Sequence, residues 1–344
     1  MGTPITDLLV GKEITIQELK GKILAVDTYN LLYQFLSSIR QPNGTPLMDS
    51  KGRTTSHLIG LFNRITKLML EDIKFVFVFD GETPELKKKE RERRKKLKLE
   101  AQDLYEEAKQ REDTREMKKY ASRTSKLDEE MIKEAKKLIT ALGMPIIDAA
   151  SEGEAQAAFM VQNKDCYAVV SQDTDSLIFG APLVVKNLTI SGKRKTINKL
   201  TYKNISPELI SLFDNLNNLG VTQEQLIVIA MLAGTDYNIG GVKGIGPKKA
   251  LALVKNNKED YEATFKEAKW DENFDIEWQE IFYLIKKIPV KKDYELEWKN
   301  PDSEAIIKLL VDEHDFNRER VEKTIEKLFK GKPKKEQKGL GEFF

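Results

Sequence analysis

The chain has 344 residues but very little cysteine or histidine. Cys166 is its single cysteine, so no disulfide can form within the chain, and we expect a reducing compartment such as the cytoplasm. His57 and His314 are its two histidines, too few together with one cysteine for a zinc site built from the usual ligands. The sequence therefore excludes the disulfide-rich class of proteins and argues against the structural zinc class.

Long hydrophobic runs are missing as well. The longest near-continuous apolar run, residues 226–233, is far shorter than the roughly 20 residues that a membrane helix needs. The amino terminus also lacks the charged start and apolar core of a signal peptide. We therefore expect a cytoplasmic protein without membrane association. Its length is enough for one large or two modest domains with an ample core.

An excess of one charge sign is absent overall, because 57 Lys and Arg nearly cancel 55 Asp and Glu. The charges are unevenly distributed, however. Between residues 87 and 98, nine Lys or Arg stand against only Glu90 and Glu92, a net charge of +7. This run favours a helix without a wide apolar face, which we expect to project from the body. A solvated helix explains it, but its place directly behind Asp80 favours a contact with nucleic-acid phosphate.

Three apolar runs typical of buried strands end in acids. Helical stretches between them predict right-handed βαβ connections and an α/β fold with a mostly parallel central sheet flanked by helices. The carboxyl ends of parallel strands meet at one edge, so we expect these acids to lie together and the last two to share a cation. Taken by itself, the first acid is better explained as a helix N-cap. The runs and acids are 23–26 with Asp27, 75–79 with Asp80, and 167–170 with Asp173 and Asp175.

Other elements follow from apolar spacing and turn residues. Helices are predicted over 29–39, 54–70 and 127–142. Residues 183–189 and 194–202 predict short strands around a turn at Ser191 and Gly192, which we expect to form an antiparallel margin of the sheet.

A second pair of acids, Glu152 and Glu154, precedes the helical run 155–162. Ser151 and Glu154 fit the S-x-x-E capping box, in which the two side chains satisfy backbone donors at the start of a helix. Capping gives no reason for Glu152, nor for the acids that end the next strand. Capping and metal binding therefore both remain open for this pair.

Glycines concentrate after a predicted helix at 225–233. The segment 240–249, GGVKGIGPKK, resembles a helix-hairpin-helix element, whose backbone amides and lysines hold duplex phosphates without reading sequence. Glycines let the main chain approach the phosphodiester closely. Asp236, just before the hairpin, is a further candidate acid. The candidate DNA contacts of the hairpin are Gly244, Gly246, Lys248 and Lys249.

The tail, residues 331–344, is charged and is expected to be disordered. It ends in Leu340, Phe343 and Phe344, whose exposure would lower solubility unless something covers them. The body of the protein provides that cover, or a helical turn presents them to a partner's pocket with Gln337 as a polar clasp.

With these residues in view, the chain resembles a flap endonuclease, the structure-specific 5′ nuclease of replication and repair, in its archaeal form. The likeness covers the whole chain, and its motifs do not occur together in this order by chance. They are VDTYNLLYQFL (26–36), RTTSHLIGLFNR (53–64), FVFDGETPELKKKE (77–90), SEGEAQAAFM (151–160), SQDTDSLIFGA (171–181), GTDYN (234–238) and GIGPKKA (244–250).

The resemblance implies a PIN-like 5′ nuclease fold, with residues 1–330 as one nuclease domain and 331–344 as a flexible tail. Within the domain, 85–125 would form a basic helical arch and 222–257 the helix-hairpin-helix region. Lys87 and Arg94 match the family's cationic pair that orients and polarises the scissile phosphate. The acids that the resemblance assigns to two Mg²⁺, for which Mn²⁺ can substitute, are Asp27, Asp80, Glu152, Glu154, Asp173, Asp175 and Asp236.

Further contacts are implied by the same resemblance. Tyr33 matches an aromatic residue that stacks on a base, while Arg40, Thr55 and Arg64 fall where the family touches DNA near the junction. The hairpin is one residue longer than in some relatives. A monovalent cation is associated with it, and the carbonyls of Val242 and Ile245 are candidate ligands. The ending Q-x-x-[LI]-x-x-F-F binds the ring-shaped sliding clamp in this family and stands here as Gln337, Leu340, Phe343 and Phe344.

The function implied is that of a structure-specific 5′ flap endonuclease, a monomer on its own, associated with the nucleoid if archaeal. It would hydrolyse phosphodiester bonds at junctions of single- and double-stranded DNA by two-metal-ion catalysis, with a 5′–3′ exonuclease side activity. Its roles would be Okazaki-fragment maturation and DNA repair. The alternatives are a related 5′ exonuclease or bubble-cutting nuclease of the same fold, and a non-enzymatic clamp-binding DNA adaptor, against which the set of acids argues strongly.

Overall fold

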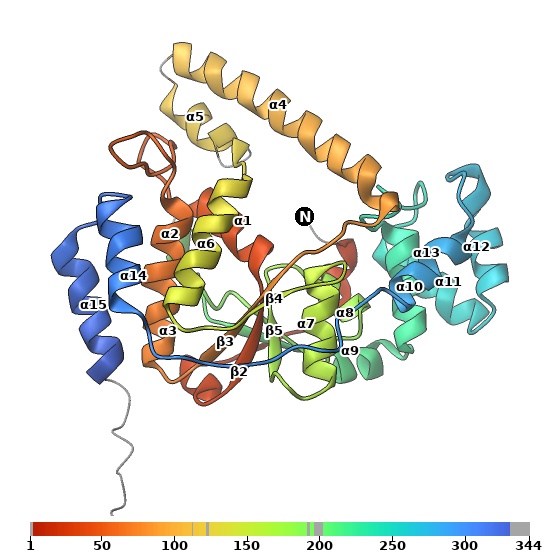
Figure 1. Ribbon diagram of the computed structural model, residues 1–344. Helices are drawn as coiled ribbons and strands as arrows, with labels where there is room; N and C mark the ends of the chain where they lie inside the picture. The colour runs from red at the N-terminus through yellow and green to blue at the C-terminus, as the bar shows by residue number, and fades with distance from the viewer. Residues whose placement is uncertain (1–2, 112, 122–123, 191–192, 196–201, 331–344) are drawn as a thin grey trace, which may run out of the picture.

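A seven-stranded sheet forms the centre of the molecule (Figure 1). The computed structural model describes residues 3–111, 113–121, 124–190, 193–195 and 202–330. The strand order across the sheet is β1-β9-β6-β5-β2-β3-β4, and β7 pairs with β8 in a separate two-stranded sheet. The strands are β1 (Lys12–Glu13), β2 (Ile23–Asp27), β3 (Lys74–Phe79), β4 (Ile146–Asp148), β5 (Ala168–Val170), β6 (Leu183–Lys186), β7 (Lys193–Lys195), β8 (Tyr202–Asn204) and β9 (Glu208–Ser211).

The predicted parallel sheet is confirmed: β4, β3, β2, β5 and β6 pair in parallel. The prediction for its antiparallel margin was wrong. The strand at 183–186 is an interior parallel strand, and the antiparallel edge is made by β9 and then β1. The second predicted strand, 194–202, overlaps β7 and the start of β8, which pair with each other in the described residues, and the turn predicted at Ser191 and Gly192 lies outside those residues.

One face of the sheet is covered by helices from both ends of the chain. Strand residues Val26 and Phe77 pack in the same apolar core as Leu32, Leu138 and Leu310 of these helices. The helices are α1 (Thr28–Ser38), α2 (Ser56–Gly60), η3 (Leu61–Ile65), α3 (Thr66–Leu70), α6 (Glu129–Ala141), α14 (Ser303–Ile307), η7 (Lys308–Asp312) and α15 (Arg318–Lys330). The helix predicted over 54–70 is thus found from 56 to 70, with a π-helical turn, η3, in its middle.

The opposite face packs a second core, which contains Ala25, Val78 and Val169 from the strands and Met160 and Ile229 from helices. Because both faces are covered, the central strands are almost wholly apolar and do not alternate with polar residues. The elements on this side are η1 (Pro4–Leu8), α7 (Gly153–Gln162), α8 (Asp175–Ile178), α9 (Leu212–Leu219), α10 (Gln223–Ala233), α11 (Pro247–Asn257), α12 (Tyr261–Glu267), η6 (Trp270–Glu272) and α13 (Trp278–Lys286). The short helix η2 (Ile16–Leu19) precedes β2.

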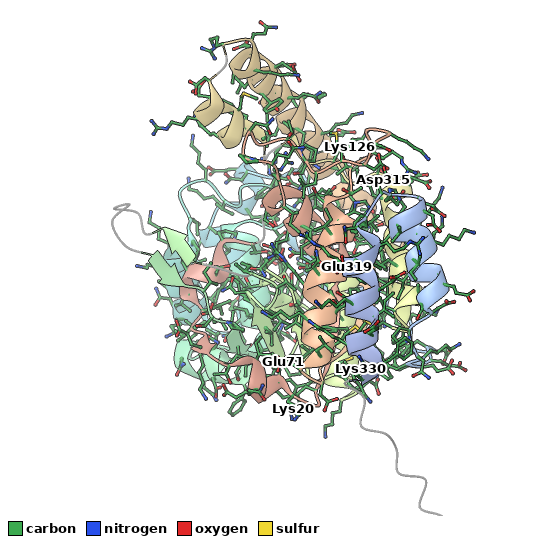
Figure 2. All side chains as sticks on the ribbon, turned by 90° about the vertical axis from the view of Figure 1, so that its left-hand side faces the viewer. Lys20, Glu71, Lys126, Asp315, Glu319 and Lys330 are labelled. Carbon is green, nitrogen blue, oxygen red and sulfur yellow. The ribbon has the colours of Figure 1, made fainter. Side chains whose placement is uncertain are left out.

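A helical arm leaves this body after β3. It consists of η4 (Glu85–Lys87), the long helix α4 (Lys88–Gln110) and α5 (Thr114–Ala121). Figure 1 shows α4 rising from the side of α10 and crossing above the sheet, with α5 returning beside its far end. Figure 2, turned by 90°, shows the same two helices standing clear of the body and carrying side chains on all sides. The projecting helix predicted from the charge run is therefore present.

Of the helices in the described ranges, none combines the length and hydrophobicity that crossing a bilayer would require.

Candidate active site

The acids that end β2 and follow β5 meet at the point where the sheet order changes direction. From β2 the chain continues to β3 on one side, while β5 pairs on the other. Ligands of open α/β sheets bind at such switch points. Asp27 caps α1 by accepting a hydrogen bond from the amide of Asn30, and the Asn30 side chain donates to Asp173 at 2.8 Å. The hydroxyl of Ser171 donates to the second oxygen of Asp27 at 3.2 Å. Asn30 and Ser171 thus hold the two acids together.

Asp80, directly after β3, caps helix α7 from a distance in sequence. Its Oδ1 accepts a hydrogen bond of 2.7 Å from the amide of Gly153, the first residue of α7. The predicted capping box was wrong, because the helix has Glu152 at the N-cap position and shows no side-chain cap bond there. The Ser151 hydroxyl instead donates to the carbonyl of Glu82. With the capping role taken by Asp80, Glu152 and Glu154 are available for other contacts.

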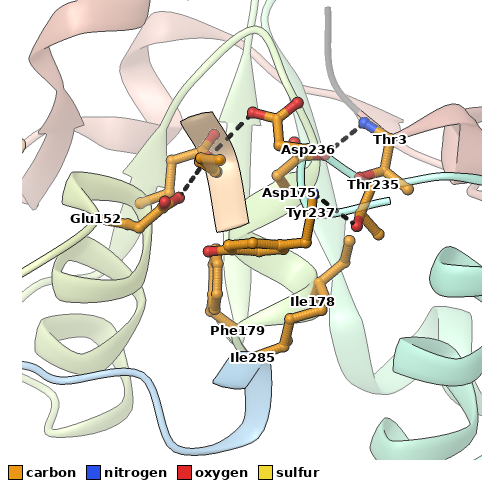
Figure 3. A pocket seen from close by; sticks show the side chains of 11 residues that line it. Thr3, Glu152, Asp175, Ile178, Phe179, Thr235, Asp236, Tyr237 and Ile285 are labelled. Atoms are coloured by element: carbon orange, nitrogen blue, oxygen red, sulfur yellow. Dashed lines mark hydrogen bonds and ion pairs between the residues drawn. The ribbon is translucent and has the colours of Figure 1, made fainter. Parts of the chain in front are cut away.

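The remaining acids come from helix starts and from the turn after α10. Asp175 is the first residue of α8 and accepts a 2.7 Å hydrogen bond from the amide of Thr3. Figure 3 shows Asp175, Asp236 and Glu152 around one pocket, with the ring of Tyr237 below them in that view. Glu154 lines the same pocket. Each of the seven predicted acids has another as an electrostatic neighbour, so the structure brings the whole set to one edge of the sheet.

Burial of these carboxylates, and then their closeness to one another, raises the pKa of several of them. Burial, with a further contribution from Asp80, raises the pKa of Asp27 to about 7. Burial and Asp173 raise the pKa of Asp175 to about 6, although the Thr3 amide opposes the change. Burial, Asp175 and Asp27 raise the pKa of Glu154 well above its ordinary value. The edge therefore carries more negative charge than its own hydrogen bonds neutralise.

Two cations from the start of the arm reach into this cluster. Lys87 Nζ lies 2.5 Å from Glu152 and 3.2 Å from Asp236, and it stands over the ring of Tyr237 at 5.3 Å. Burial alone would lower the pKa of Lys87, but the charges of Glu152 and Asp236 outweigh it, and the pKa is raised. Arg94, two turns further along, donates from Nη2 to Asp236 at 2.6 Å. Both predicted cations therefore face the acids.

The donor set suits a hard divalent cation. Carboxylate oxygens are the ligands that Mg²⁺ and Mn²⁺ prefer, and both histidines lie elsewhere. Within the described part of the chain, no three acidic, histidine or cysteine side chains are placed close enough to hold an ion as they stand. Here Lys87 and the amides of Gly153 and Thr3 occupy several of the carboxylate oxygens. The carboxylate oxygens are therefore the right kind of ligand for Mg²⁺ or Mn²⁺. In the conformations seen here, the described side chains do not surround an ion.

Comparison with known proteins agrees with this arrangement. The model of the XPG N-terminal domain matches residues 5–101, and that of the XPG I-region matches residues 143–236. A flap endonuclease 1 from Pyrococcus abyssi is 50% identical over 344 residues, which is 100% of this chain and 98% of that protein. The chain belongs to the flap endonuclease family. A relative of the same name from Staphylothermus marinus is 50% identical over 334 residues, covering 96% of this chain and 95% of its own.

Solved structures agree with this assignment. Flap endonuclease-1 from Methanococcus jannaschii superimposes with a TM-score of 0.75 at 42% identity, over 96% of this chain and 98% of that one. The catalytic core of Rad2 in complex with a DNA substrate gives a TM-score of 0.66 at 22% identity, over 95% of this chain and 100% of that one. The second likeness shows the fold alone. Together they confirm the PIN-like nuclease fold that the sequence predicted.

Two of the predicted DNA contacts of this flap endonuclease, Tyr33 and Arg40, lie on or just after α1 and have different surroundings. Tyr33 on α1 is 36% exposed, with Lys98 Nζ of the arm 4.6 Å from the centre of its ring. Arg40 is held by bonds to the carbonyls of Leu36 and Gly44 and to the hydroxyl of Ser125. Tyr33 therefore lies within reach of the arm, while Arg40 ties the loop after α1 to the chain that leaves the arm.

Thr55 and Arg64 have structural partners of their own. Thr55 is 3% exposed and precedes α2. Arg64 donates to the carbonyl of Thr189 and stacks over the ring of Phe35. The side chain of Thr55 thus offers little surface, and the Arg64 guanidinium is already engaged.

The hairpin between α10 and α11 has the conformation that its glycines predict. Gly244 has φ +81°, and a Cβ at Gly244 or at Gly246 would meet no atom within 4 Å. Lys248 and Lys249 are exposed at the start of α11, and Lys249 Nζ bonds the carbonyl of Gly244 at 3.0 Å. The loop therefore presents open main chain and positive charge on one surface.

Some predictions fall outside the described residues. The tail 331–344, its expected disorder and the clamp-binding residues Gln337, Leu340, Phe343 and Phe344 lie there. Conversely, the structure adds residues at the site that sequence reasoning missed. Asn30 stands inside the motif 26–36 and Tyr237 inside 234–238, so the motifs contained both without indicating their roles. Thr3 reaches Asp175 through its backbone, and no side-chain pattern signals that contact.

Proposed function

We propose how this chain, a structure-specific 5′ flap endonuclease, cuts DNA. Asp27, Asp80, Asp173 and Asp175, together with the two glutamates of 152–154 and Asp236, would hold two Mg²⁺ ions, with Mn²⁺ as a substitute. Bound Mg²⁺ would supply a hydroxide nucleophile and stabilise the leaving oxygen. The observation that carries the proposal is the convergence of all seven acids at one sheet edge beneath a basic arm.

The two cations at the base of the arm would bind the scissile phosphate. Lys87 and Arg94 already face the acids, at distances that ion pairs require. A phosphate at this edge would meet both cations, which would offset negative charge as it develops in the transition state. The acids in turn orient Lys87 and Arg94, so both cations are already in position before DNA binds.

Recognition would depend on DNA shape. Tyr33 would stack on a base beside the cut, and the arch from about 85 to 125 would admit a single-stranded 5′ end below α4. Arg40, Thr55 and Arg64 would border the junction. The hairpin, with Gly244, Gly246, Lys248 and Lys249, would hold duplex phosphates through amides and charge, and a monovalent cation would bind the carbonyls of Val242 and Ile245.

We also propose that residues 337–344 bind a sliding clamp. The spacing of Gln337, Leu340, Phe343 and Phe344 suits one helical turn that inserts apolar side chains into a partner's pocket. In this scheme residues 1–330 act as one nuclease domain and the tail recruits it to DNA. Because the substrate is DNA, we propose a location at the nucleoid.

One assay tests the metal-dependent mechanism. A labelled 5′ flap substrate is incubated with the protein in Mg²⁺, with EDTA as the control, and flap affinity is measured in Ca²⁺. We expect cleavage only with Mg²⁺, and we expect Asp175→Ala to lose cleavage while flap affinity stays within a few-fold. Asp148→Ala is a matched control, because Asp148 also ends a strand but pairs with Lys136 on the surface. Cleavage by Asp175→Ala at the wild-type rate would remove Asp175 from the metal site.

Two further measurements separate the alternatives. Rates on flap, nicked and bubble substrates distinguish a flap endonuclease from a related 5′ exonuclease or bubble-cutting enzyme. Tight DNA binding without a metal-dependent product would instead indicate a clamp-binding adaptor.

Deletion of residues 337–344 tests the role of the tail. It should abolish stimulation by a clamp and leave basal cleavage unchanged; calorimetry showing the same clamp affinity after the deletion would refute the proposed role of the tail.

A further inference from the structure

Glu90 is an unusual residue for its place in the chain. It lies in the most basic segment of the protein, on a helix that projects into solvent, yet only 5% of its side chain is exposed. Glu92, two positions further along the same helix, is exposed. Burial of a carboxylate is costly unless charged partners compensate it, so the environment of Glu90 needs an explanation.

Two arginines surround the Glu90 carboxylate. Arg93 donates from Nε to Oε2 at 2.7 Å and from Nη2 to Oε1 at 2.8 Å, a bidentate pair. Arg94 donates from Nε to the same Oε1 at 2.6 Å. These bonds to both arginines lower the pKa of Glu90, although its burial acts in the opposite direction. Glu90 therefore stays ionised and holds both guanidinium groups.

The bond to Arg94 determines where the rest of that guanidinium points. With Nε held by Glu90, the Nη2 end donates to Asp236 at 2.6 Å and so faces the acid cluster. An arginine side chain loses rotamer entropy when it is fixed, and the bond to Glu90 on the same helix imposes that restriction before substrate binds. Glu90 also lines a surface pocket together with Asp236 and Thr3, so it lies where the arm meets the body.

We propose that Glu90 is a positioning residue for the cleavage reaction. Glu90 fixes Arg94 in the orientation that presents its Nη groups to the scissile phosphate. Arg93 pairs with the same carboxylate and offsets the negative charge of Glu90. The inference rests on the proposed function of Arg94. Glu90 itself touches neither the phosphate nor the acids that would hold metal; it acts through Arg94.

The decisive experiment compares Glu90→Ala with Glu92→Ala. Both substitutions remove one negative charge from the same helix, so any general gain in attraction to DNA is equal. We expect Glu90→Ala to lower the single-turnover cleavage rate about 10- to 100-fold, as loss of an orienting partner typically does. Glu92→Ala should cleave at the wild-type rate, and flap affinity measured in Ca²⁺ should agree between the two variants within a few-fold.

A double-mutant cycle separates positioning from helix stability. If Glu90 acts through Arg94, adding Glu90→Ala to Arg94→Ala should lower the rate no further. If Glu90 only stabilises α4, the second substitution should lower the rate again, and that result would overturn the inference. So would wild-type cleavage by Glu90→Ala while Arg94→Ala is slow. Full activity of Arg94→Ala alone would instead refute the proposed role of Arg94.

Discussion

Replacement of Asp27 by asparagine should make the metal-free protein more stable. The pKa of Asp27 is about 7, against 3.8 for an ordinary aspartate, because the side chain is buried beside Asp80 and Asp173. This difference makes proton binding roughly a thousandfold stronger in the folded state, which corresponds to about 4 kcal/mol of destabilisation when the group is forced to ionise. Asparagine keeps an acceptor for the Asn30 amide and carries no charge. About 4 kcal/mol is therefore the upper limit of the gain.

The gain should depend on pH in a defined direction. Between pH 3.8 and about 7 the folded protein binds more protons at Asp27 than the unfolded chain does. The wild type therefore loses stability as pH rises through this window, and the loss is complete above it. We therefore expect the free energy of unfolding of Asp27→Asn to exceed that of the wild type by less than about 1 kcal/mol at pH 4 and by the full amount at pH 8.

Urea unfolding in EDTA at pH 4, 6 and 8 measures this difference directly. Asp148→Asn is the matched control, because Asp148 also ends a strand of the sheet but is exposed and bonded to Lys136 at 2.5 Å. That variant should gain nothing at any pH. Added Mg²⁺ should stabilise the wild type more than Asp27→Asn, since a ligand stabilises the state that binds it. An equal free energy of unfolding for wild type and Asp27→Asn at pH 8 would refute the crowding of charge on which the site rests.

Three further predictions concern other parts of the molecule. Lys87→Met should lower single-turnover cleavage by about 10²- to 10³-fold, measured at saturating enzyme, with flap affinity in Ca²⁺ little changed. Gly241→Ala should destabilise the hairpin by more than about 2 kcal/mol in urea unfolding, because its φ is +64° and a Cβ would lie 2.4 Å from the Ala233 carbonyl carbon; Gly240→Ala, with φ +82° and open space, should cost about 1 kcal/mol. His314→Gln should lower the melting temperature, measured by calorimetry, because the buried His314 ring contacts Asp49 through Nδ1 at 3.1 Å and loss of that hydrogen bond costs about 2 kcal/mol; an unchanged melting temperature would contradict that structural role.

Much of the site could be predicted because it depends on strand ends. Asp27 and Asp80 each follow an apolar run, and parallel pairing of β2 with β3 places the two ends side by side. That inference needs only hydrophobic pattern and topology, both of which sequence supplies. Asp173 followed the same logic. The parallel core of the sheet was predictable for the same reason, since runs of consecutive apolar residues indicate strands covered on both faces.

The antiparallel edge was less predictable because two short segments competed for it. Residues 194–202 and 208–211 both follow β6 within a short stretch of chain, and edge strands have weak patterns. The segment 208–211 pairs with β6 because Ile210 reaches the apolar core, where it is 2% exposed. Leu209 packs against the core on the other face, so the segment contributes to both cores, which a count of strand-forming residues does not reveal.

The histidines show a second limit of sequence reasoning. His57 and His314 were useful only as evidence against zinc, yet the structure joins them through one buried acid. Glu134 lies 3.2 Å from His57 Nε2 and 3.0 Å from His314 Nε2, and His314 Nδ1 lies 3.1 Å from Asp49. This network links α2 and α6 to the chain before α15. Its members are far apart in sequence, so no local spacing indicates it.

The contacts of the arm could not be predicted for the same reason, because they join residues far apart in sequence. They matter most for function. Arg94 and Asp236 are separated by 142 positions, and Lys87 and Glu152 by 65. Local propensity predicts only a solvated helix with a net charge of +7, in which every cation is equivalent. Tertiary structure distinguishes them, because Lys87 and Arg94 pair with acids of the cluster, whereas cations such as Lys88 and Lys95 are exposed. The residues that matter in the arm are therefore selected by the acids below it, and Glu90 is identifiable only once both partners of Arg94 are known.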